Sequence, residues 1–121
     1  MKFIFVVSTL IFIFASLAHA GEADVIKVKI KPTDTNTYRF DVTLRHKDEG
    51  WNHYADKWDV VASDGTVLGT RVLYHPHVDE QPFTRSLTGV KIPAGIEKVT
   101  VRAHDSLHKY GGRVVTVKVP R

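Results

Sequence analysis

The chain has 121 residues, of which 43% are hydrophobic and 25% charged, with a formal net charge of +4, no cysteine and seven histidines. This length fits one domain, and the composition excludes wholesale disorder, collagen and a coiled coil. The absence of cysteine excludes a disulfide scaffold, a thiolate zinc site, a catalytic thiol and a lipoprotein anchored through cysteine. Seven histidines against one methionine is the unusual feature of this composition.

The first twenty residues have the pattern of a secretory signal peptide. A positive start at Lys2 precedes an almost unbroken apolar run, and Ala18-His19-Ala20 supplies small residues at the two positions that a signal peptidase reads. The run is short for a membrane span, which makes an uncleaved anchor the less favoured interpretation. We expect cleavage after Ala20, and a cut after Ala18 would instead expose His19 as the N-terminus. The mature chain, residues 21–121, is then periplasmic or secreted and has no membrane partner.

After residue 20 the sequence shows no helical periodicity, whereas apolar and polar residues alternate with a period of two in many places. In chain order, strands are predicted at 25–31, 38–45, 54–62, 67–74, 83–92, 97–105 and 114–119. Asp64-Gly65 marks a tight hairpin turn between the third and fourth strands. Seven short strands in this length predict one all-β domain, an immunoglobulin-like seven-stranded antiparallel β-sandwich, with an open barrel as the alternative.

The predicted topology brings the histidines together. In such a sandwich the connections after the second, fourth and sixth strands lie at the same end. His46 and His53 flank the first of these connections. His75 and His77 lie in the second, and His104 and His108 flank the third. All six histidines of the mature chain are therefore expected at one end of the sandwich.

The phase of the strands predicts which of these side chains point inward. His46 continues the apolar series that runs through Leu44, and Asp105 continues the series that runs through Ala103. His104 falls on the opposite, outward face. A carboxylate at the edge of a core is costly without a partner, and a metal ion or a protonated histidine would supply one.

Three segments resemble the iron-site pattern of the desulfoferrodoxin and superoxide reductase family. They are His46, His53-Tyr54-Ala55-Asp56-Lys57-Trp58, and Ala103-His104-Asp105-Ser106-Leu107-His108. The resemblance implies an immunoglobulin-like sandwich in which several histidines and a cysteine thiolate hold iron. His46 and His53 match the two loop histidines of that family, and His108 matches its last histidine.

The sequence departs from that family at two positions. Asp105 stands where the family has its cysteine, and the family's earlier histidine has no counterpart between Gly21 and Arg45. His75 or His77 could fill this second position. Without a thiolate, superoxide reduction by the family mechanism is disfavoured, whereas a metal site of related architecture is still expected.

Three histidines and one carboxylate suit a borderline metal such as zinc, copper(II), iron(II) or nickel. We therefore predict that His46, His53 and His108 bind one transition-metal ion, either iron, copper or zinc. Asp105 is either a fourth ligand or a hydrogen-bond acceptor that fixes a histidine tautomer. The pair His75 and His77 is a weaker candidate. The predicted role is metal handling or redox protection outside the cytoplasm.

The sequence is also compatible with two other functions. The first is a metal-free module in which Trp51, Tyr54 and the 75–82 loop bind a sugar or a protein, while Trp58 packs in the core. The second is a small oxidoreductase that acts on superoxide. The basic residues are spread along the chain, which argues against a nucleic-acid partner. No Gly-x-Ser-x-Gly sequence is present, so an acyl-transfer enzyme is disfavoured.

Overall fold

The computed structural model describes residues 21–121, so the predicted signal peptide lies outside the described residues. All regular secondary structure in this part of the chain is strand. The elements are β1 (Asp24–Asp34), β2 (Thr37–Arg45), β3 (Ala55–Ala62), β4 (Val67–Val72), β5 (Phe83–Lys91), β6 (Lys98–Asp105), β7 (Lys109–Tyr110) and β8 (Val115–Lys118).

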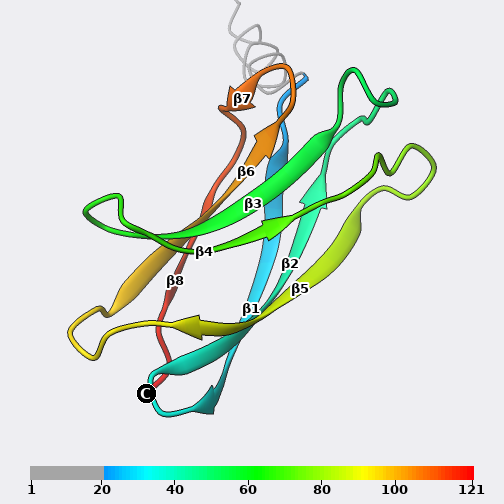
Figure 1. The fold of residues 1–121 in the computed structure, drawn as a ribbon. Helices are drawn as coiled ribbons and strands as arrows, with labels where there is room; N and C mark the ends of the chain where they lie inside the picture. The colour runs from blue at the N-terminus through cyan, green and yellow to red at the C-terminus, as the bar shows by residue number, and fades with distance from the viewer. Residues whose placement is uncertain (1–20) are drawn as a thin grey trace, which may run out of the picture.

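The strands form two antiparallel sheets (Figure 1). One sheet has the order β1-β2-β5. In the other, the order is β4-β3-β6-β7, and β8 also pairs with β6. This division of strands confirms the immunoglobulin-like sandwich. All seven predicted strands are present, with ends that agree to within three residues. The two-residue β7 is an additional, eighth strand.

The core lies between the two sheets and follows the alternation of the strands. In β2, Tyr38, Phe40, Val42 and Leu44 are buried, whereas the residues between them are more accessible. Trp58 of β3 is fully buried opposite this face, as predicted. Burial of one large apolar side chain stabilises a fold by about 1.5–3 kcal/mol, so this row is a main source of stability.

The connections β2–β3, β4–β5 and β6–β7 lie together at one end of the sandwich (Figure 1). The β3–β4 and β5–β6 turns lie at the other end. In the β3–β4 turn, Gly65 has a φ of +91°, as expected for the predicted Asp-Gly turn. Within residues 21–121, the structure contains no helix with the length and apolarity that a membrane span requires. All six histidines of residues 21–121 lie in or beside the β2–β3, β4–β5 and β6–β7 connections, at the same end of the sandwich.

Candidate metal centre

His46, His53 and Asp105 form a group that could hold one metal ion. Their ligand atoms all lie within 4.8 Å of one another. His46 directly follows β2, His53 lies shortly before β3, and Asp105 is the last residue of β6. The pairing of Ala55 with Asp105 brings the start of β3 beside the end of β6. Residues that are 59 positions apart in the chain therefore meet because two strand ends and one loop converge.

Asp105 is oriented by the loop that follows it. Its Oδ1 accepts hydrogen bonds from the backbone N–H groups of Leu107, at 2.6 Å, and His108, at 2.8 Å. Its Oδ2 faces Nε2 of His46 and lies 2.8 Å from Nε2 of His53. Asp105 is 0% exposed and His46 is 2% exposed, which confirms that both side chains point inward.

A second carboxylate supports each imidazole ring on its other side. Nδ1 of His46 contacts Oδ1 of Asp48, and Nδ1 of His53 lies 2.6 Å from Oε1 of Glu49. An ionised carboxylate only accepts hydrogen bonds, so each Nδ1 carries the proton and donates it. This leaves Nε2 of both rings directed toward Asp105. Carboxylates behind the ring are the usual support of metal-binding histidines.

The charged neighbours shift the pKa values of the group. Burial lowers the pKa of His46, but the hydrogen bonds with Asp48 and Asp105 outweigh burial and raise it above 6.5. The hydrogen bond with Glu49 is the main cause of the raised pKa of His53. Burial raises the pKa of Asp105, but hydrogen bonds from the His108 and Leu107 N–H groups and from His46 bring it below 3.8.

These shifts describe a site that attracts positive charge. With Nδ1 protonated, the Nε2 atom of a neutral ring presents a lone pair to Oδ2 of Asp105 and to the carbonyl oxygen of Gly21. Lone pairs facing one another are unfavourable unless a proton or a metal ion lies between them. The same nitrogens can therefore bind either protons or one metal ion, and these two states compete.

His108 lies at the edge of this group. Its ring centroid is 4.9 Å from that of His53, and a Cβ atom placed on Gly21 would lie 2.9 Å from its Nε2. The ring is exposed, unlike that of His46. His108 is thus beside the three-residue group without belonging to it, and its role as a ligand stays a prediction.

His75 and His77 form a separate pair with ring centroids 4.7 Å apart. The ring of His77 is stacked on Phe83 at 4.0 Å, and its Nε2 accepts a hydrogen bond from Arg85 at 3.0 Å. Burial is the main cause of the lowered pKa of His77, which keeps the ring neutral. His75 is exposed beside it. The structure does not bring this pair into the His46 group, and His77 serves chiefly to pack its loop.

His104 points to the outer face of the sheet, as predicted. Its Nδ1 lies 2.6 Å from Oδ1 of Asp56, and its ring makes an edge contact with Tyr110. It belongs to the same end of the fold but to a different surface. The six histidines thus divide into the inner pair His46 and His53, His108 at the edge of their group, the loop pair His75 and His77, and the outward His104.

The sequence reasoning missed four residues that support the site. Asp48 and Glu49 lie behind the two rings, and Gln81 accepts a hydrogen bond from the His46 backbone N–H at 2.9 Å. Gly21 presents its carbonyl oxygen to both Nε2 atoms, at 3.3 Å from His46 and 3.1 Å from His53. Two carboxylates between two histidines, as in 46–53, are the only signal that could have indicated part of this set.

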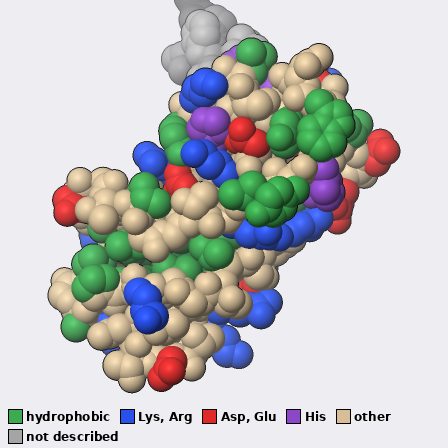
Figure 2. Space-filling model, in the orientation of Figure 1, with side chains coloured by type: hydrophobic (Ala, Val, Ile, Leu, Met, Phe, Trp, Pro, Cys, Tyr) green, Lys and Arg blue, Asp and Glu red, His purple; other side chains and the backbone are tan. Residues whose placement is uncertain are grey.

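Exposed aromatic side chains accompany the histidines at this end. Trp51 is 67% exposed and makes an edge contact with Tyr54, and Tyr74 is 74% exposed. Figure 2 shows hydrophobic and histidine side chains on the upper part of the molecule, near acidic groups. The surface around the group is thus partly apolar.

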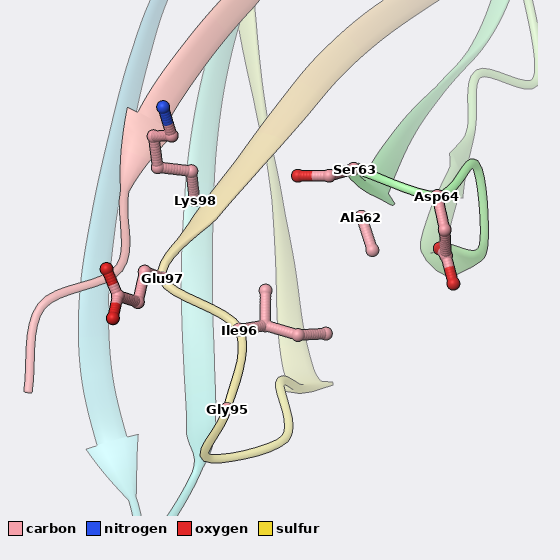
Figure 3. A pocket seen from close by; sticks show the side chains of 7 residues that line it. All are labelled: Ala62, Ser63, Asp64, Gly95, Ile96, Glu97 and Lys98. Atoms are coloured by element: carbon pink, nitrogen blue, oxygen red, sulfur yellow. The ribbon is translucent and has the colours of Figure 1, made fainter.

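The opposite end carries a shallow hollow of about 270 Å³. It is lined by the β3–β4 turn and the segment before β6, including Ser63, Asp64, Ile96 and Lys98 (Figure 3). Its volume is below the roughly 300–1,000 Å³ of typical ligand pockets, and it contains no histidine. The hollow is separate from the candidate metal-binding group.

No protein-family model matches the chain. A protein of Halomicrobium mukohataei with the name "Putative lipoprotein" is 43% identical to it over 96 residues. The match covers 79% of this chain and 47% of that protein, so the chain spans about half the length of this relative.

Proposed function

We propose that this protein is an exported transition-metal-binding protein that acts in metal handling or redox protection. The observation that carries the proposal is the convergence of His46 Nε2, His53 Nε2 and Asp105 Oδ2, with a carboxylate behind each ring. Export is supported by the signal-peptide pattern and by the relative, because lipoproteins are exported proteins.

The chemistry of the group supports a site that exchanges or uses its metal. Structural zinc sites have four protein ligands, whereas sites with three protein ligands keep a position for water or substrate. Two imidazoles and a carboxylate give three such ligands here. Imidazole suits zinc, copper, iron and nickel, so we propose one of these ions rather than calcium or magnesium.

Metal titration tests this proposal. We expect the protein to bind one equivalent of Zn²⁺ or Cu²⁺, measured by calorimetry and by elemental analysis after gel filtration. His53→Ala and Asp105→Asn should each abolish stoichiometric binding. His75→Ala is the matched control, because this exposed histidine lies outside the group, and it should bind as the wild type does. A wild-type protein that retains no metal would contradict the proposal.

A superoxide-consuming activity is the second candidate. It is supported by the resemblance of His46, His53 and His108 to iron-site histidines of the desulfoferrodoxin and superoxide reductase family, with Asp105 in place of that family's cysteine. The carboxylate in place of the thiolate argues for slow turnover. The zinc-loaded protein is the blank, because zinc does not change oxidation state. We expect the iron-loaded and copper-loaded proteins to consume superoxide only slightly faster than this blank. A fast reaction with either redox-active metal would favour the reductase instead.

The exposed aromatic residues support a metal-free binding module as the third candidate. Trp51 and Tyr54 contact each other at a centroid distance of 5.6 Å, so they form a small platform beside the group. Such a platform suits a sugar or a peptide. Ligand binding that persists in Asp105→Asn and is lost in Trp51→Ala would favour this candidate over the metal protein.

A further inference from the structure

Gly21 lies among three imidazole rings. Its carbonyl oxygen is 3.1 Å from Nε2 of His53 and 3.3 Å from Nε2 of His46. A Cβ atom on this residue would lie 2.9 Å from Nε2 of His108. The φ of Gly21 is +87°, a conformation that glycine adopts without strain. The backbone of Gly21 is therefore part of the candidate metal centre.

The segment that follows Gly21 is held firmly in this position. The backbone N–H of Arg113 donates to Oδ1 of Asp24 at 2.7 Å, and the N–H of Val25 donates to the carbonyl of Arg113 at 2.8 Å. Ala23 is 1% exposed. A Cβ atom on Gly112 would lie 2.0 Å from the carbonyl oxygen of Ala23. The close approach that only glycine permits thus fixes the start of the fold beside the histidines.

The sequence predicts that the peptide bond before Gly21 is the one that a signal peptidase hydrolyses. In this reaction one water molecule adds across the bond, Ala20 leaves with a new carboxylate, and Gly21 keeps a new α-amino group. An amide nitrogen is a poor ligand because its lone pair is delocalised into the carbonyl. An amine nitrogen, in contrast, has a lone pair that a metal ion can accept.

We propose that cleavage after Ala20 completes the metal centre, with the α-amine of Gly21 as a ligand beside His46, His53 and Asp105. This inference rests on the proposed function of the same site. The nitrogen and carbonyl oxygen of one residue lie at most about 3.6 Å apart, so an amine at Gly21 is within reach of an ion that the Nε2 atoms bind. The amine and the carbonyl oxygen can then chelate one ion in a five-membered ring.

The added amine strengthens binding of a borderline transition metal by the mature protein. Two imidazole nitrogens, one amine nitrogen and one carboxylate oxygen form a nitrogen-rich set, for which copper(II) has the highest affinity among the divalent first-row ions. We therefore assign copper(II) as the preferred ion. The precursor lacks this amine, so high affinity develops only when the signal peptide has been removed.

The test compares two forms of residues 21–121, which contain every described strand. One form has a free α-amine at Gly21, and the other has an acetylated amine and is otherwise identical. Cu²⁺ affinity is measured by competition with a chromophoric chelator, and circular dichroism checks that both forms are folded. We expect acetylation to lower the Cu²⁺ affinity by roughly 10–100-fold or more. Loss of a residue that only supports a ligand already has this effect, and the amine is proposed to bind the ion directly.

Isotope labelling gives a second readout. In the free-amine form, substitution of ¹⁵N-glycine should change the nitrogen hyperfine pattern of bound Cu²⁺, and in the acetylated form it should not. The mass of the full chain after export should correspond to a start at Gly21. Equal affinities, no isotope effect or a start at another residue would overturn the inference but leave the proposed function intact. If neither form binds metal, the proposed function itself fails.

Discussion

Asp48 connects the two histidine-bearing loops through one buried carboxylate. Its Oδ1 contacts Nδ1 of His46 and accepts the backbone N–H of Ala55 at 3.1 Å. Its Oδ2 accepts the backbone N–H of His77 at 2.6 Å. The side chain is almost completely buried. Asp48 therefore both orients a proposed metal ligand and fixes the loop that carries His77.

Asp48→Asn should weaken both the fold and metal binding. The new amide group places N–H donors where the carboxylate accepted, so at least one buried donor loses its partner. We expect a loss of about 1–3 kcal/mol in the free energy of unfolding, measured by urea denaturation. Metal affinity, measured by calorimetry, should fall roughly 10–100-fold because the ring of His46 loses its support.

Glu49→Gln is the matched control for this variant. Glu49 supports His53 in the same way, but its side chain is 58% exposed. Loss of the Glu49 charge should change the free energy of unfolding by less than about 0.5 kcal/mol. The variant should therefore lower metal affinity without a matching loss of stability. If Asp48→Asn left both quantities at their wild-type values, the connecting role of Asp48 would be refuted.

The sequence predicted the inward orientation of His46 and Asp105 correctly because each continues a strand whose apolar phase is regular. The supporting contacts could not be predicted in this way. Asp48 lies in an irregular connection, where no periodicity indicates the direction of a side chain. Gly21 meets the rings only because the segment after it packs beside the 111–113 loop. Contacts of this kind depend on tertiary packing rather than on local pattern.

At the level of elements, a polar cluster on the outer face joins four strands of the larger sheet. Asp59 of β3 accepts hydrogen bonds from Thr70 of β4 at 2.7 Å and from Arg102 of β6 at 3.2 Å. It also accepts the hydroxyl of Tyr110 in β7 at 2.5 Å. This explains why β7 was not predicted: two residues carry no periodicity, and their strand depends on these distant partners.

The same cluster predicts a dependence of stability on pH. Burial raises the pKa of Asp59, but the hydrogen bonds from Thr70, Tyr110 and Arg102 outweigh burial and lower it below its ordinary value of 3.8. A carboxylate with a lowered pKa stabilises the fold above its ordinary pKa, and this contribution is lost as the pH falls through the folded-state pKa. The contribution is thus present at neutral pH.

Asp59→Asn measures this contribution. At neutral pH the variant should be less stable than the wild type by about 1–3 kcal/mol in urea denaturation, because buried donors lose a charged acceptor. The difference should narrow progressively at pH values below 3.8. A difference that stayed constant across this range would show that the charge of Asp59 does not stabilise the sheet.

At the level of the whole molecule, the proposed metal centre bridges the two sheets. His46 follows β2 of the three-stranded sheet, whereas His53 lies shortly before β3, and Asp105 ends β6, of the five-stranded sheet. The sequence predicted this sandwich because its strands alternate regularly. The bridge itself follows from the way the strand ends converge. A bound ion would connect the sheets at their histidine-rich end.

Metal binding should therefore stabilise the whole fold. An ion at one hundred times its dissociation constant adds about 2.7 kcal/mol, and for a domain of this size such a gain raises Tm by roughly 10–20 °C. Scanning calorimetry with Zn²⁺ should show this rise, and EDTA should reverse it. His104→Ala, on the outer face, should keep the full rise, whereas Asp105→Asn should lose it. An equal rise in the wild type and Asp105→Asn would mean that the ion binds elsewhere and does not bridge the sheets.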